Sequence, residues 1–134
     1  MIFVDTSAFL AVENRKDACH QRARRFMDTC LKGGQTLVTT DYVLDESYTI
    51  IRLRAGHAVA VDFGEGVRRS RFMRVESVTS EVIDAAWTLF KKYRDHDFSF
   101  TDCTSFVVME RLEIATAFAF DDDFQEYGQF LVKP

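Results

Sequence analysis

Four acidic residues of this chain lie beside apolar segments, where burial of an unpaired carboxylate is unfavourable. Asp5 ends the apolar run MIFVD, and Asp121 follows the run AFAF directly. Glu46 shares helical spacing with an apolar stripe, and Asp102 lies among the apolar residues of SFTDCTSF. Each has an ordinary structural explanation when taken alone, as a helix cap, a boundary residue or a turn former. One shared cause explains all four more economically than four separate ones.

Carboxylates that converge repel one another, and metal binding is the chemistry that relieves the repulsion. Two like charges about 4 Å apart cost about 4 kcal/mol at an effective dielectric of 20. Only protonation or a bound cation removes that cost. Carboxylate oxygens suit Mg²⁺ or Mn²⁺ and not zinc, and His20, His57 and His96 show no ligand spacing with the cysteines. An all-carboxylate site of this type indicates phosphate chemistry.

The elements that must position these acids alternate between strand and helix. Strands are predicted at 1–5, 36–40, 72–78 and 114–120, with a possible edge strand at 129–133. Helices are predicted at 16–32, 41–55, more weakly at 57–70, from Thr79 or Ser80 onward, and from about 101 to 112. The segment TSAFL after Asp5 is interpreted as a short turn. The alternation predicts one α/β domain over residues 1–134, with a parallel sheet covered by helices on both faces.

Two of the acids are predicted to meet at one edge of this sheet. Asp5 ends the first strand and Asp121 ends the fourth. Parallel strands bring their carboxyl ends to the same edge, and binding sites of open α/β sheets form there.

Composition limits the classes of function. The chain has 134 residues, 47% of them hydrophobic and 28% charged, which fits a globular protein with its own core. No apolar stretch approaches the roughly 20 residues of a membrane span. The first residues include Asp5 and no basic segment, so we expect no secretory leader, a cytoplasmic location and three reduced cysteines.

Four segments resemble the motifs of a known family. In order and separation, VDTSA, TTDYVLDE, SFTDC and AFAFDDDF resemble the four motifs of PIN-domain ribonucleases, and most resemble the VapC-like toxins of type II toxin–antitoxin pairs. The resemblance implies a doubly wound parallel sheet, dependence on Mg²⁺ or Mn²⁺, and endonucleolytic cleavage of RNA that leaves a 5′-phosphate. It departs from the family at Ala119, where the fourth motif often has Thr.

The resemblance also assigns residues. It makes Asp5, Glu46, Asp102 and Asp121 the catalytic quartet, with Asp5, Asp102 and Asp121 as metal ligands. Its supporting residues are Ser7, Thr101 and Asp123, the first two as polar neighbours that orient water or phosphate.

The expected partners follow from charge and from the resemblance. The net charge is −4, yet setting aside Asp5, Glu46, Asp102 and Asp121–Asp123 leaves 15 acids against 17 Lys and Arg. A surface of that balance can hold an RNA backbone, although the sequence does not single out the arginines that do so. The resemblance further implies a homodimer and a small antitoxin, which would present Arg or Lys to the acidic pocket.

Three alternatives remain at this point. A receiver-like phosphoacceptor domain also gathers acids around Mg²⁺ at strand ends, but it has an acidic pair after its first strand where this chain has only Asp5. A catalytically silent binding module would keep the fold for protein contacts. A stand-alone RNA-processing nuclease would keep the activity without an antitoxin.

Overall fold

Five short strands form one parallel sheet at the centre of the molecule. The computed structural model describes all 134 residues. The strands are β1 (Ile2–Val4), β2 (Leu37–Thr40), β3 (Met73–Glu76), β4 (Thr116–Phe118) and β5 (Leu131–Lys133). Their order across the sheet is β3-β2-β1-β4-β5, and every neighbouring pair is parallel. The predicted doubly wound parallel sheet is therefore confirmed, with 129–133 as its edge.

The strand order identifies where a site should form. From β1 the chain adds β2 and β3 on one side, and then returns to add β4 and β5 on the other. The direction of winding thus reverses between β1 and β4, and crevices that bind ligands open at such a reversal, beyond the carboxyl ends of the strands. This order also differs from the 2-1-3-4-5 order of receiver-like folds. The receiver-like alternative is therefore wrong.

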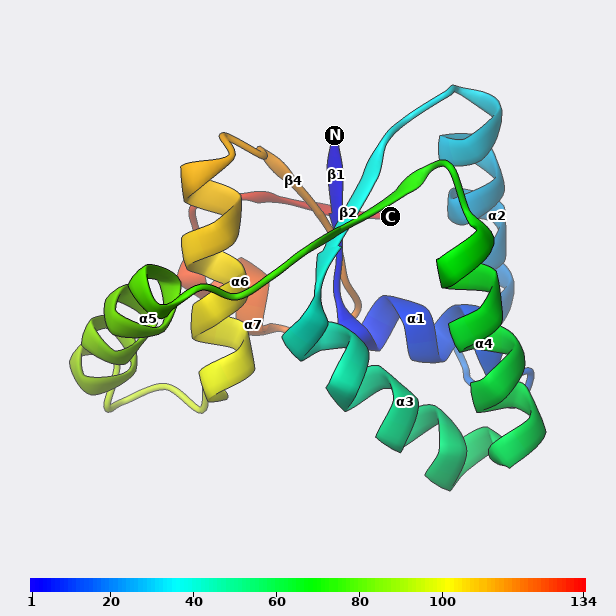
Figure 1. Ribbon diagram of the computed structural model, residues 1–134, viewed down its shortest axis with the longest axis horizontal. Coiled ribbons are helices and arrows are strands. Elements are labelled where there is room, and N and C mark those ends of the chain that lie inside the picture. The colour runs from blue at the N-terminus through cyan, green and yellow to red at the C-terminus, as the bar shows by residue number, and fades with distance from the viewer.

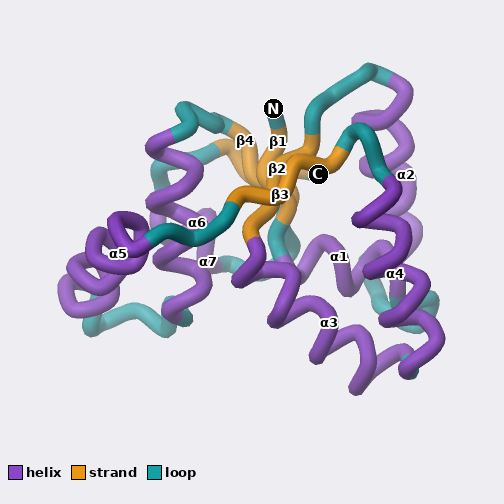
Figure 2. Tube along the Cα trace, viewed as in Figure 1, coloured by secondary structure: helices purple, strands orange, loops and turns teal.

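Seven helices cover the two faces of the sheet. They are α1 (Thr6–Glu13), α2 (His20–Lys32), α3 (Asp41–Ala55), α4 (His57–Arg69), α5 (Ser80–Lys92), α6 (Phe100–Arg111) and α7 (Asp123–Tyr127). In Figure 1, α1 to α4 lie on one side of the strands and α5 to α7 on the other. Figure 2 shows the strands as a central layer between these two groups. Gly56 ends α3 with φ of +105°, a conformation that glycine adopts most readily, and α4 begins at the next residue.

The core lies between the sheet and both helix layers. The strand side chains Phe3, Val38 and Phe118 are fully buried. On one face Phe26 of α2 packs edge-on against Phe118, with ring centroids 4.7 Å apart. On the other face Phe124 of α7 contacts both Phe3 and Phe106 of α6. These contacts hold β1, β4, α6 and α7 in fixed relation, and these are the elements next to the candidate site.

The structure corrects several predicted boundaries. The segment TSAFL is not a short turn but the start of α1, an eight-residue helix. The second helix begins at His20 and not at Lys16, and Thr40, not Asp41, is the N-cap of α3. The short helix α7 was not predicted. None of the helices combines the length and the apolar character that crossing a membrane requires.

Candidate metal centre at the carboxyl edge of the sheet

Asp5 occupies the junction between β1 and α1. Its backbone N–H donates to the carbonyl of Phe118 (3.0 Å), so the pairing of β1 with β4 extends as far as this residue. Its carboxylate caps α1 by accepting from the backbone N–H of Ser7 (3.0 Å), and it also accepts from the Ser7 hydroxyl (2.6 Å). The side chain is buried. Capping therefore explains why Asp5 suits this position, but it occupies only Oδ2 of the carboxylate.

Asp102 lies in the first turn of α6. Ser99 and Asp102 form a reciprocal capping box: the Ser99 hydroxyl accepts from the backbone N–H of Asp102 (3.0 Å), and Asp102 Oδ2 accepts from the backbone N–H of Ser99 (2.9 Å). The predicted cap is thus present. Asp102 is also buried, with an exposed fraction of only 6%. A carboxylate that only caps a helix has no need of such burial, and its second oxygen is free for another role.

Asp121 follows β4 in the loop that leads to α7. Its Oδ1 atom is buried and has no hydrogen-bond partner. A buried carboxylate oxygen without a partner is costly, because it has lost water and gained nothing in return. The loop itself is held in place, since the backbone N–H of Phe120 donates to the Ser7 hydroxyl (3.0 Å). Ser7 therefore connects the segment that carries Asp121 to the carboxylate of Asp5.

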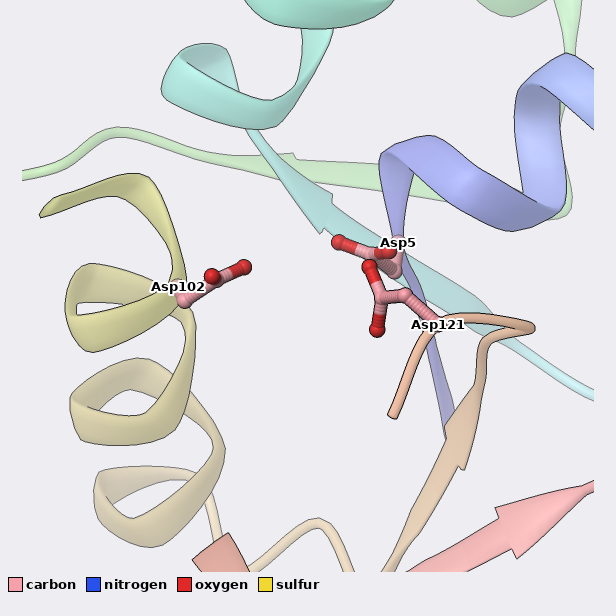
Figure 3. A group of neighbouring side chains, drawn as sticks. All are labelled: Asp5, Asp102 and Asp121. Carbon is pink, nitrogen blue, oxygen red and sulfur yellow. The ribbon is translucent and has the colours of Figure 1, made fainter. Parts of the chain in front are cut away.

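These three carboxylates converge on one point. Each offers a ligand oxygen, and the three oxygens lie within 4.8 Å of one another. Figure 3 shows the side chains pointing toward one another from three separate segments: the end of β1, the first turn of α6 and the loop after β4. Neither of the two ion pairs in the structure involves any of them. No ion pair of the protein therefore neutralises the negative charge of the cluster.

Burial and the charges of neighbouring acids raise the pKa values of Asp102 and Asp121. Burial is the first cause that raises the pKa of Asp102 to about 8, and the charges of Asp5 and Asp123 add to it, while the Ser99 backbone N–H opposes it. Burial likewise raises the pKa of Asp121 to about 8, followed by the charges of Asp5, Asp123 and Asp102. Strongly perturbed acids in a crevice are typical of functional sites. Without a cation, this cluster therefore retains protons near neutral pH.

The two remaining predicted acids lie at the border of the cluster. Asp123, the first residue of α7, lies within hydrogen-bonding reach of Asp102; burial first, and then the charges of Asp5, Asp122 and Asp97, raise its pKa. Glu46 of α3 is half-buried. Its pKa is raised by burial first and by the charges of Asp5 and Asp123, whereas the Thr6 hydroxyl lowers it. Glu46 thus faces the cluster without being one of the three converging ligands.

Of the two predicted polar neighbours, one has a visible contact. Ser7 bonds both Asp5 and the Phe120 backbone, as described above. Thr101 is half-buried, and its carbonyl accepts from the Thr104 hydroxyl; the structure gives its own hydroxyl no partner. Two residues near the acids were not predicted. Thr6 was available as the middle residue of the D-T-S motif, whereas Asp97, exposed in a loop, carries no sequence signal.

The donor set fits a hard divalent cation. The ligands are all carboxylate oxygens, which Mg²⁺ and Mn²⁺ prefer. The unpartnered Oδ1 of Asp121 is the atom that such an ion would satisfy. The neighbouring thiol does not compete, because burial, and then the charge of Asp102, raise the pKa of Cys103 to about 11 and keep it protonated. All three cysteines are free; Cys30 and Cys103 are buried, and Cys19 is partly buried.

Comparisons with known proteins agree with this geometry. The family model of the PIN domain matches residues 2–129. The chain is 38% identical over 134 residues to proteins named 23S rRNA-specific endonuclease VapC20, from Mycobacterium tuberculosis strains CDC 1551 and H37Rv; the match covers 100% of this chain and 99% of theirs. It also resembles the crystal structure of Mycobacterium tuberculosis VapC20, described as a Sarcin-Ricin loop cleaving toxin, with a TM-score of 0.89, 36% identity and full coverage of both chains.

The matches confirm the resemblance first seen in the four sequence motifs. The family model covers β1 to β4 and all the segments that carry the acidic cluster, and the two full-length matches also include β5. The catalytic and metal-binding roles of the individual residues stay predictions. The chain belongs to the PIN-domain family, as a homologue of the VapC20 toxins.

Proposed function

We propose that this protein is a metal-dependent endoribonuclease toxin of the VapC type. The observation that carries the proposal is the convergence of Asp5, Asp102 and Asp121, with an unpartnered buried oxygen and no ion pair to a basic side chain. A bound Mg²⁺ or Mn²⁺ supplies positive charge to the phosphodiester and makes water a better nucleophile. The family membership and the full-length match to named endonucleases support the same reaction class.

In this proposal the chain's own residues hold the metal ion and orient the groups around it. Asp5, Asp102 and Asp121 are the ligands of the ion. Ser7 fixes the Asp5 carboxylate and the loop before Asp121 through one hydroxyl. Glu46, held beside the cluster with Thr6, is available to accept a proton or position a water from the other side, and Asp123 contributes as an outer acid. Thr101 is a polar neighbour at the start of α6.

Cleavage of RNA with and without metal tests the proposal. Wild type should cut RNA in Mg²⁺ or Mn²⁺ and be inactive in chelator, and Asp5→Asn and Asp102→Asn should lose activity by at least a hundredfold, because each removes a ligand charge while an amide oxygen can still cap the helix. Asp84→Asn, an exposed acid of α5, is the matched control and should be as active as wild type. Full activity of Asp102→Asn would leave that residue as a cap only.

We further propose that the substrate class is a loop of ribosomal RNA. The named relatives act on 23S rRNA, and the solved relative on the Sarcin-Ricin loop. A protein reads RNA most readily where bases are unstacked, as they are in loops. Mapping the 5′ ends produced in purified ribosomes by wild type, but not by Asp5→Asn, would identify the cut. Uniform degradation of all RNA would contradict a loop-specific substrate.

The proposal includes a protein that holds the enzyme inactive in the cytoplasm. We propose a small antitoxin encoded beside the gene, with Arg or Lys side chains that enter the acidic cluster, and a homodimeric toxin. The uncompensated negative charge of the cluster supports a basic inhibitory segment. Expression of the toxin alone should arrest growth, and co-expression of the neighbouring reading frame should restore it. An active enzyme that is not toxic would instead be a stand-alone processing nuclease.

A further inference from the structure

A cavity lined by Arg22 and Phe120 lies next to the acidic cluster, and the inference drawn from it rests on the proposed ribonuclease function. We propose that the cavity between α2 and the β4–α7–β5 edge is an RNA subsite, in which Arg22 binds a backbone phosphate adjacent to the scissile one and the cavity wall accepts an unstacked base. The sequence contains many arginines and does not indicate which of them contact RNA. The structure distinguishes Arg22 from the others by its position.

The cavity adjoins the proposed site directly. Its volume is about 530 Å³, within the usual range for pockets that hold small organic groups. Its lining includes Arg22, Phe120, Asp121, Asp122, Gln125 and Phe130. Asp121 belongs to both the cavity and the acidic cluster, so a chain segment bound in the cavity continues into the site. The wall is fixed there, because Ser7 holds the backbone at Phe120.

Arg22 is a cation that lines the same cavity as Asp121 but forms no ion pair with it. Its guanidinium lies over the ring of Phe120, 5.2 Å from the ring centroid. It takes part in neither of the ion pairs of the structure, although Asp121 and Asp122 line the same cavity. A polyanion that approaches a cluster of carboxylates is repelled unless a cation accompanies it. An exposed guanidinium held by an aromatic ring, with its donors free, is suited to a phosphate.

The other components suit a nucleobase. Phe120 and Phe130 present aromatic surface, and Phe130 also contacts Tyr127, with ring centroids 5.7 Å apart, which fixes its orientation. The Gln125 amide offers both a donor and an acceptor to a base edge. Stacking on an aromatic ring is the usual way in which proteins hold an unstacked base. Aromatic rings, an amide and an unpaired guanidinium thus favour a nucleotide over an apolar peptide segment.

The other arginines with described contacts are engaged away from this cavity. Arg68 donates to the Tyr48 hydroxyl and to the Gly64 carbonyl. Arg74 pairs with Glu76, and Arg94 pairs with Asp95. Arg25, three residues after Arg22 on the same helix, is exposed and lines none of the main cavities. Arg25→Ala therefore changes the net charge as Arg22→Ala does, on the same helix but away from the cavity.

Salt-dependent RNA binding tests the phosphate contact. Binding of a short single-stranded RNA is measured in chelator over a range of salt concentrations, so that no protein cleaves it. Loss of one phosphate contact reduces the slope of log K against log salt by about 0.7 for single strands. We expect this reduction for Arg22→Ala, together with roughly tenfold weaker binding. We expect the wild-type slope for Arg22→Lys, which keeps the charge, and for Arg25→Ala.

Backbone amide chemical shifts test the location. Adding a nucleoside monophosphate to wild type should shift the amide signals of Phe120, Gln125 and Gly128, and these shifts should disappear in Arg22→Ala but persist in Arg25→Ala. Equal slopes for Arg22→Ala and wild type, or unmoved cavity amides, would overturn the subsite. Cavity amides that shift with protein concentration alone would overturn it in favour of a contact between copies of the chain.

These outcomes separate the subsite from the proposed function. RNA binding in chelator does not require cleavage. A wild type that binds RNA through Arg22 but never cleaves it in Mn²⁺ would contradict the nuclease function and support the subsite. A wild type that cleaves RNA in Mn²⁺, but whose RNA binding is unchanged by Arg22→Ala, would support the nuclease function and contradict the subsite.

Discussion

Ser7 joins the end of β1 to the loop after β4 through a single hydroxyl. The hydroxyl donates to Asp5 and accepts from the backbone of Phe120, next to Asp121. Ser7 thus fixes two of the proposed metal ligands relative to each other. Residues that orient metal ligands typically contribute about 10- to 100-fold to metal affinity or activity.

The Ser7 hydroxyl should therefore be needed for tight metal binding. Ser7→Ala should weaken Mn²⁺ binding roughly tenfold or more, because Asp5 and the Asp121 loop lose their common anchor. Calorimetric titration of Mn²⁺ measures the change. Ser105→Ala is the matched control: the Ser105 hydroxyl is also buried in the protein but has no partner, so its removal should leave Mn²⁺ affinity unchanged and stability equal or slightly higher. Equal affinities for wild type and Ser7→Ala would contradict the anchoring role.

Single residues differ in how readily the sequence indicates them. Asp5 and Asp121 can be identified from the sequence because each follows an apolar strand. Parallel strands have their carboxyl ends at the same edge of the sheet, which brings the two residues together. Asp102 is harder to identify, because its capping pattern fully explains its presence, and only its burial in the folded protein supports the second role that we propose. The sequence does not single out Arg22 as a candidate RNA contact. Arg22 belongs to a basic run whose members look alike until α2 is packed against Phe120.

At the scale of elements, the first turn of α6 contains a helix cap and, as we propose, a metal ligand. Its capping box satisfies backbone groups at the helix start, and the same Asp102 side chain faces the cluster. The two tasks use different properties: a cap needs an oxygen acceptor, and a metal ligand needs a charge. Substitutions in the two halves of the box can therefore separate them.

The paired variants Ser99→Ala and Asp102→Asn make this separation measurable. Ser99→Ala removes the hydroxyl that caps α6 and should cost about 1 kcal/mol of unfolding free energy, while a substantial part of the metal-dependent RNA cleavage remains. Asp102→Asn keeps an acceptor oxygen and should retain most of the stability but lose cleavage. Denaturant unfolding and RNA cleavage are measured on both proteins. Identical effects of the two substitutions on stability and on cleavage would show that the cap alone matters.

Helix α6 was predicted within about one residue at each end although it is buried over most of its length, whereas α1 and α7 were missed for different reasons. The segment that forms α1 has buried side chains over most of its length, so it shows no helical stripe and was interpreted as a turn. The five residues of α7 are too few to show a period. The helix α5 was predicted, but not all its large apolar side chains are buried: Phe90 and Trp87 are exposed and stack on each other. Periodicity identifies the helix, while the neighbours that cover it depend on the fold.

At the scale of the whole molecule, the site concentrates negative charge that no ion pair of the fold neutralises. The strand order places Asp5 and Asp121 at the reversal of winding, and the packing of α6 and α7 adds Asp102 and Asp123. Without metal, folding must bring these carboxylates together, whereas unfolding separates them into water. The native state therefore carries a pH-dependent cost that a bound cation removes.

The sign of this dependence follows from the raised pKa values. Asp102 and Asp121 have pKa values of about 8 in the folded protein, against about 4 for Asp in unfolded chains. Between these limits the folded state binds more protons, so this contribution to stability is fully present below about pH 4 and is lost as the pH rises through about 8. Metal-free wild type should thus melt at a lower temperature at pH 8 than at pH 6, as far as these groups are concerned.

A bound metal ion should have the opposite effect and raise the stability of the folded protein. An ion that binds only the folded state adds RT ln(1 + [L]/Kd), about 2.7 kcal/mol at a hundredfold excess over Kd, and this raises the melting temperature by several degrees. Protons compete with the ion for the same oxygens, so the rise should be larger at pH 8 than at pH 6. Asp5→Asn should show a smaller rise, and in chelator at pH 8 it should be at least as stable as wild type, because one repelling charge is gone. Asp84→Asn, with the same change in net charge on exposed α5, should behave as wild type in both respects. Thermal melts of the three proteins in Mg²⁺ and in chelator measure these differences, and an equal metal-induced rise in Asp5→Asn and wild type would exclude Asp5 as a ligand.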